Sequence, residues 1–308
     1  DSINQLAGIM SDQQIQTFYL PLLHRLSSGE WFTSRTSAAL LFASVYEKIP
    51  LSMRADVHSM FVSLCTDETP MVRRAAARDM SALVKRMSPE VIINEMLPLY
   101  RRLSADDQDS VRLLTVQNLV AMAEVLSPAE TQQLLLSSIC GAFQDKSWRV
   151  RYMAADNFVQ LATAVGEDVV KEDLVPAYIN LMRDAEAEVR TAAATQLPGL
   201  AKLLDQNTII ERLLPVAKEL ADDPSQHVRG ALAAQVSALA PLLGKDATTE
   251  HLLPLFLQLL KDEFPEVRLN IISRLEQVNE VIGIDLLSQS LLPAIMTLAE
   301  DKQWRVRQ

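Results

Sequence analysis

The chain has 308 residues, of which 49% are hydrophobic, 5% are aromatic and only eight are glycine. A composition rich in leucine and alanine but poor in glycine and aromatic residues favours helices packed on helices. The formal net charge of −10 gives no electrostatic basis for binding nucleic acid or an anionic membrane surface, so both are excluded as general partners.

No segment is predicted to cross a membrane or to act as a signal peptide. The longest apolar run lies around residues 252–260, whereas a membrane-spanning helix needs roughly 20 apolar residues. Cys65 and Cys140 lie far apart and share no metal-ligand spacing with the four histidines. We therefore expect a reducing intracellular compartment and no structural zinc.

A repeat of 39 residues organises the chain, because the dipeptide Val-Arg recurs at that interval and an aspartate stands six positions before each of its arginines. The arginines are Arg73, Arg112, Arg151, Arg190, Arg229, Arg268 and Arg307. The aspartates are Asp67, Asp106, Asp145, Asp184, Asp223, Asp262 and Asp301. An earlier, degenerate copy keeps Arg35 but has Ser34 and Gly29 in place of the valine and the aspartate.

In chain order, the first residues resemble the end of a helix, and each repeat then predicts a helix A, a short polar loop and a helix B. Helix A has apolar residues twelve and nine positions before the arginine, such as Leu23 and Leu26. Helix B has small or apolar residues three, four, seven and ten positions after it, which form one helical stripe. At the joints, Ser127-Pro128-Ala129-Glu130 predicts a helix start with a complete capping box, and Ser88-Pro89-Glu90 predicts a weaker one.

A proline recurs 14 residues before the arginine, inside the predicted helix A. It removes one backbone hydrogen bond, so we expect it to bend the helix at the same place in each repeat that has it. The prolines are Pro21, Pro98, Pro176, Pro215, Pro254 and Pro293.

The predicted fold is all-α: a solenoid of two antiparallel helices per repeat, stacked into a curved superhelical arc. Residues 1–308 are expected to form a single continuous array of about seven full repeats plus the first helix of an eighth. The last repeat stops where its helix B should begin. We therefore expect a fragment of a longer scaffold, truncated at both ends.

The recurring aspartate and arginine predict a ladder between repeats. Equivalent side chains of stacked repeats lie close together, so the arginine of one repeat can reach the loop aspartate of its neighbour. Each partly exposed rung would contribute only about 0.5 to 1 kcal/mol, so its expected use is to set the register between repeats. The alternative is that the aspartate merely caps helix B and the arginine is solvated.

No residue pattern predicts catalysis or a cofactor. The histidines fall at no ligand spacing, and the chain has no glycine-rich phosphate loop and no nucleophile motif. Paired acids such as Asp106 and Asp107 are ordinary in solvated loops. We therefore expect a protein that is not an enzyme and that binds neither a cofactor nor a metal.

The tryptophans mark the loops as candidate partner contacts. Trp31, Trp148 and Trp304 are the three tryptophans of the chain, and all lie in loops that are otherwise polar rather than on the apolar stripes. An aromatic side chain presented on a loop by a rigid scaffold is a candidate binding contact. The alternative is that each ring folds back onto the adjacent helix.

Five segments carry a resemblance to known families: residues 30–37 (EWFTSRTS), 69–77 (TPMVRRAAA), 106–114 (DDQDSVRLL), 145–153 (DKSWRVRYM) and 265–273 (PEVRLNIIS). The pattern resembles HEAT repeats, since a period of 39 fits them better than tetratricopeptide or ankyrin units. More closely, the whole chain resembles the PR65 scaffolding proteins of protein phosphatase 2A, from about their fourth repeat into their eleventh.

This resemblance implies a non-catalytic scaffold that binds a phosphatase catalytic subunit and B-type regulatory subunits, as a hetero-oligomer rather than a homo-oligomer. It implies a cytoplasmic location, with the nucleus as a second one. In that family the loops of the N-terminal and central repeats hold the regulatory subunit, and those of the last five repeats hold the catalytic subunit. Most of the latter are missing here, so we expect regulatory binding to be better preserved.

Carried over to this sequence, the resemblance implies two groups of contact residues. The regulatory contacts are Trp31, Phe32, Thr69, Pro70, Met71, Arg73, Arg74, Asp109, Ser110, Trp148 and Arg149. The catalytic-subunit contacts are Trp304 and Arg305. The periodicity assigns Arg73 to the ladder and leaves Arg74, one step round the helix, to meet an acidic partner.

Two other binding classes remain as alternatives. A nuclear-transport receptor of the importin β type is also an acidic helical solenoid, but it would be expected to have aromatic-lined grooves between A helices. A tubulin-binding HEAT array would be expected to have basic loops, and these loops are acidic.

Overall fold

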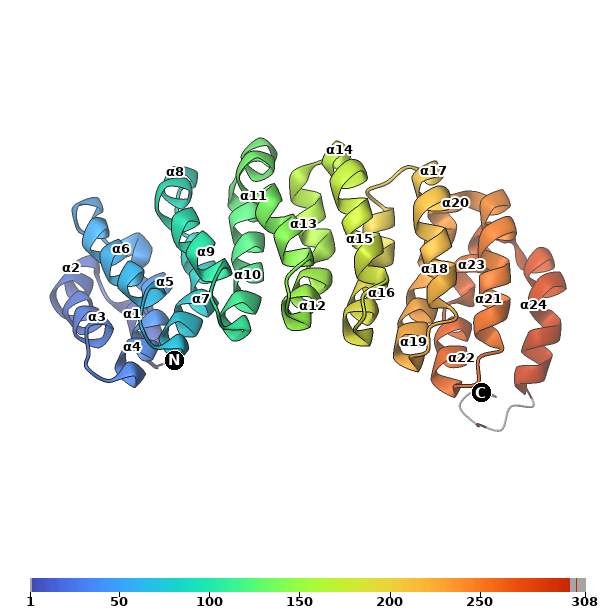
Figure 1. Ribbon diagram of the computed structural model, residues 1–308, viewed down its shortest axis with the longest axis horizontal. Coiled ribbons are helices and arrows are strands. Elements are labelled where there is room, and N and C mark those ends of the chain that lie inside the picture. Colours follow the sequence, from blue (N-terminus) through green and yellow to red (C-terminus); the bar gives the residue numbers. More distant parts are fainter. Residues whose placement is uncertain (1, 300–302, 304–308) are drawn as a thin grey trace. The chain divides into compact units, whose positions relative to one another are not determined.

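The computed structural model describes residues 2–299 and 303, and every element in that part of the chain is helical. Contacts within the chain cluster into two units, residues 1–153 and 154–308, and each is described by itself. In each unit, helices follow one another as neighbouring pairs (Figure 1). The predicted order of helix A, loop and helix B is confirmed in repeats 1–7.

The first unit begins with α1 (Ser2–Ile9), where the sequence predicts the end of a helix. Helix A consists of α2 (Asp12–Gln14), η1 (Ile15–Tyr19) and α3 (Leu20–Ser27) in repeat 1 and of α6 (Leu51–Cys65) in repeat 2. It consists of α8 (Pro89–Val91), η3 (Ile92–Met96) and α9 (Leu97–Ser104) in repeat 3 and of α11 (Pro128–Phe143) in repeat 4. Its B helices are α4 (Phe32–Ala39), α5 (Phe42–Val45) and η2 (Tyr46–Lys48); α7 (Pro70–Val84); α10 (Asp109–Val125); and most of α12 (Trp148–Asp156).

The second unit continues helix B of repeat 4 with α13 (Phe158–Val165). Its A helices are α14 (Glu167–Val169), η4 (Val170–Leu174) and α15 (Val175–Met182); α17 (Gln206–Thr208), η5 (Ile209–Leu213) and α18 (Leu214–Leu220); η7 (Thr248–Leu252) and α21 (Leu253–Leu260); and α24 (Ile284–Ala299). Its B helices are α16 (Ala187–Ala201); α19 (Gln226–Gln235), η6 (Val236–Leu239) and the part of α20 (Ala240–Ala247) before Gly244; and α22 (Pro265–Ile272) and α23 (Leu275–Ile282). Gly244 has a non-helical backbone, and the residues of α20 after it begin helix A of repeat 7.

The recurrent proline interrupts helix A with a π-helical turn. In repeats 1, 3, 5, 6 and 7 the proline is the second residue of an α-helical segment that directly follows a five-residue π turn. Proline lacks an N–H and its ring clashes with the carbonyl four residues earlier, and the wider turn makes room for the ring. Repeats 2 and 4 have Ser59 and Ser137 at this position, and α6 and α11 are uninterrupted. Pro293 is the exception, because α24 is a single α-helix around it.

The joints between repeats place a helix N-cap at the same repeat position. Ser127 forms the predicted capping box with Glu130, whereas Ser88 has the extended N-cap backbone but no side-chain cap bond. Gly166, Gly244 and Gly283 occupy the equivalent position in later repeats, with φ of 86°, 74° and 85°. These backbone angles favour glycine, so the joint is made by a side-chain cap in some repeats and by a left-handed glycine in others.

Helix B supplies the continuous core of each unit. The valine of every described Val-Arg dipeptide is at most 3% exposed, and the alanines at the start of the helix B stripe are also buried. Helix B of one repeat packs against helix B of the next, as α7 does on α10 and α16 on α19. This packing brings the start of each helix B, and the loop before it, next to the equivalent segment of the following repeat.

Candidate functional site: the loops between helices A and B

The repeat arginine joins two successive loops. Arg73 donates from Nε and Nη2 to Asp106 Oδ2 and Oδ1 of the next repeat, at 2.5 and 3.2 Å. Its Nη1 donates to the backbone carbonyls of Asp67 and Glu68 in its own loop, at 2.7 and 3.1 Å. One guanidinium therefore ties its own loop backbone to the carboxylate of the following repeat, a bidentate geometry to which arginine is suited.

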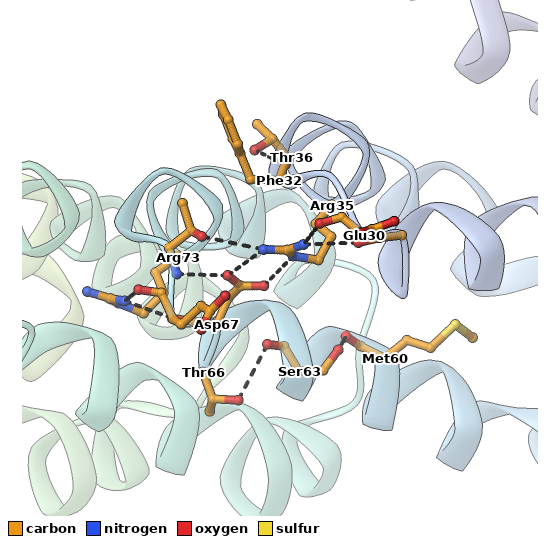
Figure 2. Close-up of polar contacts among 12 residues, drawn as sticks. Glu30, Phe32, Arg35, Thr36, Met60, Ser63, Thr66, Asp67 and Arg73 are labelled. Atoms are coloured by element: carbon orange, nitrogen blue, oxygen red, sulfur yellow. Dashed lines mark hydrogen bonds and ion pairs between the residues drawn. The ribbon is translucent and has the colours of Figure 1, made fainter.

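The same arrangement repeats within each unit, and Figure 2 shows the rung from Arg35 to Asp67. In the first unit the rungs are Arg35–Asp67, Arg73–Asp106 and Arg112–Asp145. In the second unit they are Arg190–Asp223 and Arg229–Asp262. For the other ladder residues, Arg151 and Arg268 donate to the carbonyls of Asp145 and Asp262 in their own loops, and the Asp184 carbonyl accepts from Arg190. Asp301 and Arg307 lie outside the described residues.

The direction of the rungs explains why the first repeat can lack the aspartate. A ladder aspartate accepts from the arginine of the repeat before it, whereas the arginine donates only to backbone carbonyls in its own loop. Arg35 therefore donates to the carbonyls of Gly29 and Glu30, at 2.9 and 2.8 Å, although Gly29 has replaced the aspartate. Ser34 replaces the valine without disturbing these contacts.

Each ladder aspartate also fixes its own loop. Asp67 Oδ1 accepts from the Thr69 N–H at 2.8 Å, and Asp145 Oδ1 accepts from the Ser147 N–H at 2.7 Å. The alternative expectation, that the aspartate only caps helix B, is wrong for Asp67, because its carboxylate accepts from the N–H of the N-cap residue Thr69 in the loop and α7 has no side-chain cap bond. A solvated arginine is wrong for the rungs, because the Arg112 and Arg229 side chains are only 5% and 10% exposed.

The rungs lower the pKa of two carboxylates, Asp67 and Asp106. Burial by itself raises the pKa of Asp67, but the hydrogen bonds from Arg35 and from the Thr69 N–H outweigh it, and the pKa lies below its ordinary value of 3.8. The pKa of Asp106 is lowered in the same way, by Arg73 and the Gln108 N–H against burial. These carboxylates are therefore ionised at neutral pH.

The loops of repeats 1 and 2 expose apolar side chains outside this network. Trp31 is 72% exposed, Met71 55% and Phe32 39%. Phe32 points away from the Arg35–Asp67 rung (Figure 2). Pro70 and Arg74 are exposed at the start of α7. Thr69 differs, because it is half-buried and its hydroxyl accepts from Arg35 Nη2 at 3.4 Å.

In repeats 3 and 4 the predicted contact residues meet one another. Asp109 Oδ2 accepts from the Ser147 hydroxyl at 2.9 Å and from Arg149 Nη1 at 3.4 Å. The Arg149 guanidinium lies 5.0 Å from the centre of the Trp148 ring, a cation–π contact. Trp148 is consequently half-buried beneath an exposed arginine, and Ser110 is half-buried next to Asp109. Trp304 and Arg305 lie outside the described residues.

One polar contact between helices was not predicted. His58 in α6 is buried, and its Nδ1 pairs with Glu95 in η3 of the next repeat while Nε2 lies 2.8 Å from the Tyr46 hydroxyl. These residues have no common spacing in the sequence, so only the stacking of repeats 1, 2 and 3 brings them together. Across the described residues, no group of three or more His, Cys, Asp or Glu side chains could hold a metal ion. No helix there is long and apolar enough to span a membrane.

Stacked helix pairs with this loop ladder define a HEAT-repeat fold. Residues 135–165 and 252–282 match the family model of the HEAT repeat, and residues 167–244 match that of the PPP2R1A-like HEAT repeat. Among solved structures, the chain is similar to Kap95p in complex with RanGDP, with a TM-score of 0.71, 15% identity and coverage of 94% of this chain and 39% of that one. It is also similar to Kap121p bound to the C-terminus of Cdc14p, with a TM-score of 0.72, 14% identity and coverage of 99% and 34%. At these identities the likeness concerns the fold alone.

More similar sequences confirm the resemblance to phosphatase 2A scaffold proteins. The A-type regulatory subunit of protein phosphatase PP2A from Schizosaccharomyces pombe is 52% identical over 105 residues, which is 34% of this chain and 18% of that protein. The protein phosphatase 2A scaffold subunit of Dictyostelium discoideum is 47% identical over 100 residues, 32% and 17% of the two chains. A probable PP2A regulatory subunit of Caenorhabditis elegans is 46% identical over 93 residues, 30% and 16%. Each match spans less than a fifth of the relative.

Proposed function

We propose that this chain is a non-catalytic scaffold of a serine/threonine protein phosphatase 2A holoenzyme. Its loops between helices A and B would hold B-type regulatory subunits and the catalytic subunit. The observation that carries the proposal is the 46–52% identity to proteins named as regulatory or scaffold subunits of this phosphatase.

The geometry of the loops supports this role. Arg35 and Arg73 hold the backbone carbonyls of the loops of repeats 1 and 2 while they pair with the next repeat, so the side chains beside them are presented on rigid backbone and lose little conformational freedom when a partner binds. Trp31 and Met71 are exposed although they are large and apolar. Aromatic residues and arginine dominate binding energy at protein interfaces, and both types occur in these loops.

Direct binding tests the proposal. The purified chain is immobilised, and purified B-type regulatory and catalytic subunits are titrated over it separately and together. We expect saturable binding of the regulatory subunit, weakened by Trp31→Ala combined with Phe32→Ala. Phe18→Ala is the matched control, because Phe18 is 66% exposed but lies in η1 of helix A, outside the loops.

The absence of binding by either subunit, or an equal loss with the Phe18 control, would reject the loop assignment. As a scaffold, the chain alone should also hydrolyse no phosphopeptide under conditions in which the catalytic subunit does so.

The transport-receptor alternative gains no support from the cavity between the A helices of repeats 1 and 2. A cavity of about 410 Å³ lies between α3 and α6, and its apolar lining comes from Leu20, Pro21, Met53, Val57 and Met60. The aromatic residues that the alternative leads us to expect are missing from this lining.

A further inference from the structure

A second cavity, of about 200 Å³, lies inside the first unit between repeats 3 and 4. It is bounded by α9, α10, α11 and the start of α12, close to the loop ends of these helices. Its volume has room for several water-sized groups at about 30 Å³ each. The polar residues of its lining are Tyr100, Ser104, Arg112, Thr115, Ser138 and Asp145.

The repeats themselves show that this lining departs from the common pattern. Thr115 stands three residues after the repeat arginine, where the other repeats have Ala38, Ala76, Ala154, Ala193, Leu232 and Ile271. Ser138 stands thirteen residues before it, where the others have Leu22, Met60, Leu99, Ala177, Val216, Leu255 and Ala294. Both positions are polar only here, and both side chains line the same cavity. Such local departures from a repeat rule are expected at functional sites.

Hydroxyl groups of four residues, Tyr100, Ser104, Thr115 and Ser138, line the cavity together. The Thr115 hydroxyl donates to the Arg112 carbonyl at 2.7 Å and the Ser104 hydroxyl donates to the Arg101 carbonyl at 3.1 Å. Burial raises the pKa of Tyr100 to about 12, so the phenol stays protonated. Tyr178 occupies the same repeat position in repeat 5, but its hydroxyl donates to the Ala193 carbonyl at 2.5 Å. Tyr100 is only 2% exposed and Thr115 only 3%, so these donors and acceptors form the inner wall of the cavity.

The charges of the cavity compensate one another. Arg112 is 5% exposed, and its Nε and Nη2 both donate to Asp145 at 2.9 Å. Its Nη1 donates to the backbone carbonyls of Asp106 and Asp107. The lining therefore offers the Tyr100 and Ser138 hydroxyls, which can donate or accept, and the Thr115 and Ser104 hydroxyl oxygens, which can accept, next to an ion pair that is already satisfied. Such a lining gives no excess charge to balance a charged ligand, and a buried ion without a partner would be costly.

We propose that this cavity is a binding site for a small uncharged molecule that both donates and accepts hydrogen bonds, such as a primary carboxamide. The depth of Tyr100 and Thr115 favours a free small molecule over a side chain of a partner protein. The site is independent of the phosphatase-scaffold role, and its test uses no phosphatase subunit.

The test follows the Val150 methyl resonances of the full chain while acetamide is added, because Val150 lines the cavity. We expect saturable shifts with acetamide and at least about tenfold weaker binding of acetate and of methylammonium. Tyr100→Phe and Thr115→Ala should each weaken acetamide binding about tenfold, the effect of losing one buried hydrogen bond. Tyr178→Phe is the control and should bind as the parent chain does.

A second variant separates binding from folding. Ser138→Leu introduces the residue found at this position in three other repeats and fills the cavity, so we expect it to abolish acetamide binding while the melting temperature stays equal or rises. Shifts that do not saturate, charged probes that bind as tightly as acetamide, or equal binding by Ser138→Leu would each overturn the proposal and leave a cavity that holds only water.

Discussion

At the residue scale, Asp106 has more hydrogen-bond partners than the 39-residue period predicts, because the period predicts only a pairing with the arginine of a neighbouring repeat. Asp106 accepts two bonds from Arg73 and one from the Gln108 N–H, while its backbone carbonyl accepts from Arg112. The rung side chains are also more buried than expected: 19% exposure for Arg73 and 6% for Asp106. Because removal of one partner would leave a largely buried charge, the cost exceeds the 0.5 to 1 kcal/mol typical of exposed pairs.

The lowered pKa values of Asp67 and Asp106 predict acid sensitivity of the first unit. A carboxylate whose folded pKa lies below its unfolded value contributes stability above the ordinary pKa of 3.8, and this contribution is lost as the pH falls through the lowered folded pKa. In urea titrations, Asp67→Asn should be less stable than the parent at pH 6, and the difference should shrink below about pH 4. A difference that is constant from pH 6 to pH 3 would contradict this role.

Trp148 is predicted to be a binding hot spot. Trp148→Ala should weaken binding of the B-type regulatory subunit by about 2 kcal/mol, roughly thirtyfold in Kd, because the ring and the arginine above it are presented as one unit. Circular dichroism should show unchanged helicity. The conservative Trp148→Phe keeps an aromatic face for Arg149, so it should weaken binding of the regulatory subunit less than Trp148→Ala does. An unchanged affinity for Trp148→Ala would remove the residue from the proposed interface.

At the element scale, repeats with and without the proline form an internal comparison. The same helix A contains a π turn before Pro98, Pro176 or Pro215, and is a continuous α-helix where Ser59 or Ser137 stands instead. The backbone thus adapts to proline by widening one turn rather than by ending the helix. The apolar stripe of helix A remains buried in both forms, as Phe61 and Tyr178 show.

Ser137→Pro tests whether this adaptation depends on the local sequence. Ser137 is exposed in the uninterrupted α11, so a proline there removes one helical bond and creates a clash without losing any buried side chain. We expect a loss of about 3 kcal/mol or more in the free energy of unfolding, measured by urea denaturation. Ser137→Ala is the control and should be neutral or slightly stabilising. A loss below about 1 kcal/mol for the proline variant would mean that α11 forms a π turn as readily as its neighbours.

At the scale of the whole molecule, each unit is a one-dimensional stack in which a repeat contacts its neighbours. Stability in such a stack is approximately a sum of terms for single repeats and for the interfaces between them. Ladder rungs belong to the interface terms, since each joins one repeat to the next. Loss of one rung should therefore act locally rather than throughout a unit.

The interface between repeats 5 and 6 contains two ion pairs, one largely buried and one exposed, that can be compared directly. Arg190 and Asp223 are 13% and 6% exposed, whereas Arg183 and Glu219 are 52% and 51% exposed in the same interface. Arg190→Ala should reduce stability by about 2 to 4 kcal/mol because it leaves Asp223 largely buried and unpaired. Arg183→Ala should cost less than about 1 kcal/mol. Hydrogen exchange should show faster opening of α16 and α19 in the first variant only, and similar exchange in both would argue against the ladder as the element that couples repeats.

The helix pairs and their period could be predicted from the sequence, because apolar stripes leave a regular signal along the chain. The recurrent arginine and aspartate also marked candidate rung residues, although the rung from Arg35 was not among them. Gly166, Gly244 and Gly283 follow the same period as Ser127, so the position of the joints could have been read from the sequence. The positive φ of these glycines could not be predicted from the sequence, because the side-chain-capped joints and the glycine joints differ in backbone conformation at one shared repeat position.

Three features of the loops could not be predicted without the packing of the helices: the direction of each rung, the placement of Arg149 over Trp148 by Asp109, and the cavity that Thr115 and Ser138 line together with Tyr100. These contacts join residues from different helices, and their distances depend on how neighbouring repeats pack. Spacing in the sequence shows which side chains lie at equivalent positions. The direction of a hydrogen bond, the burial of a charge and the shape of a cavity are set by the helices stacked around them.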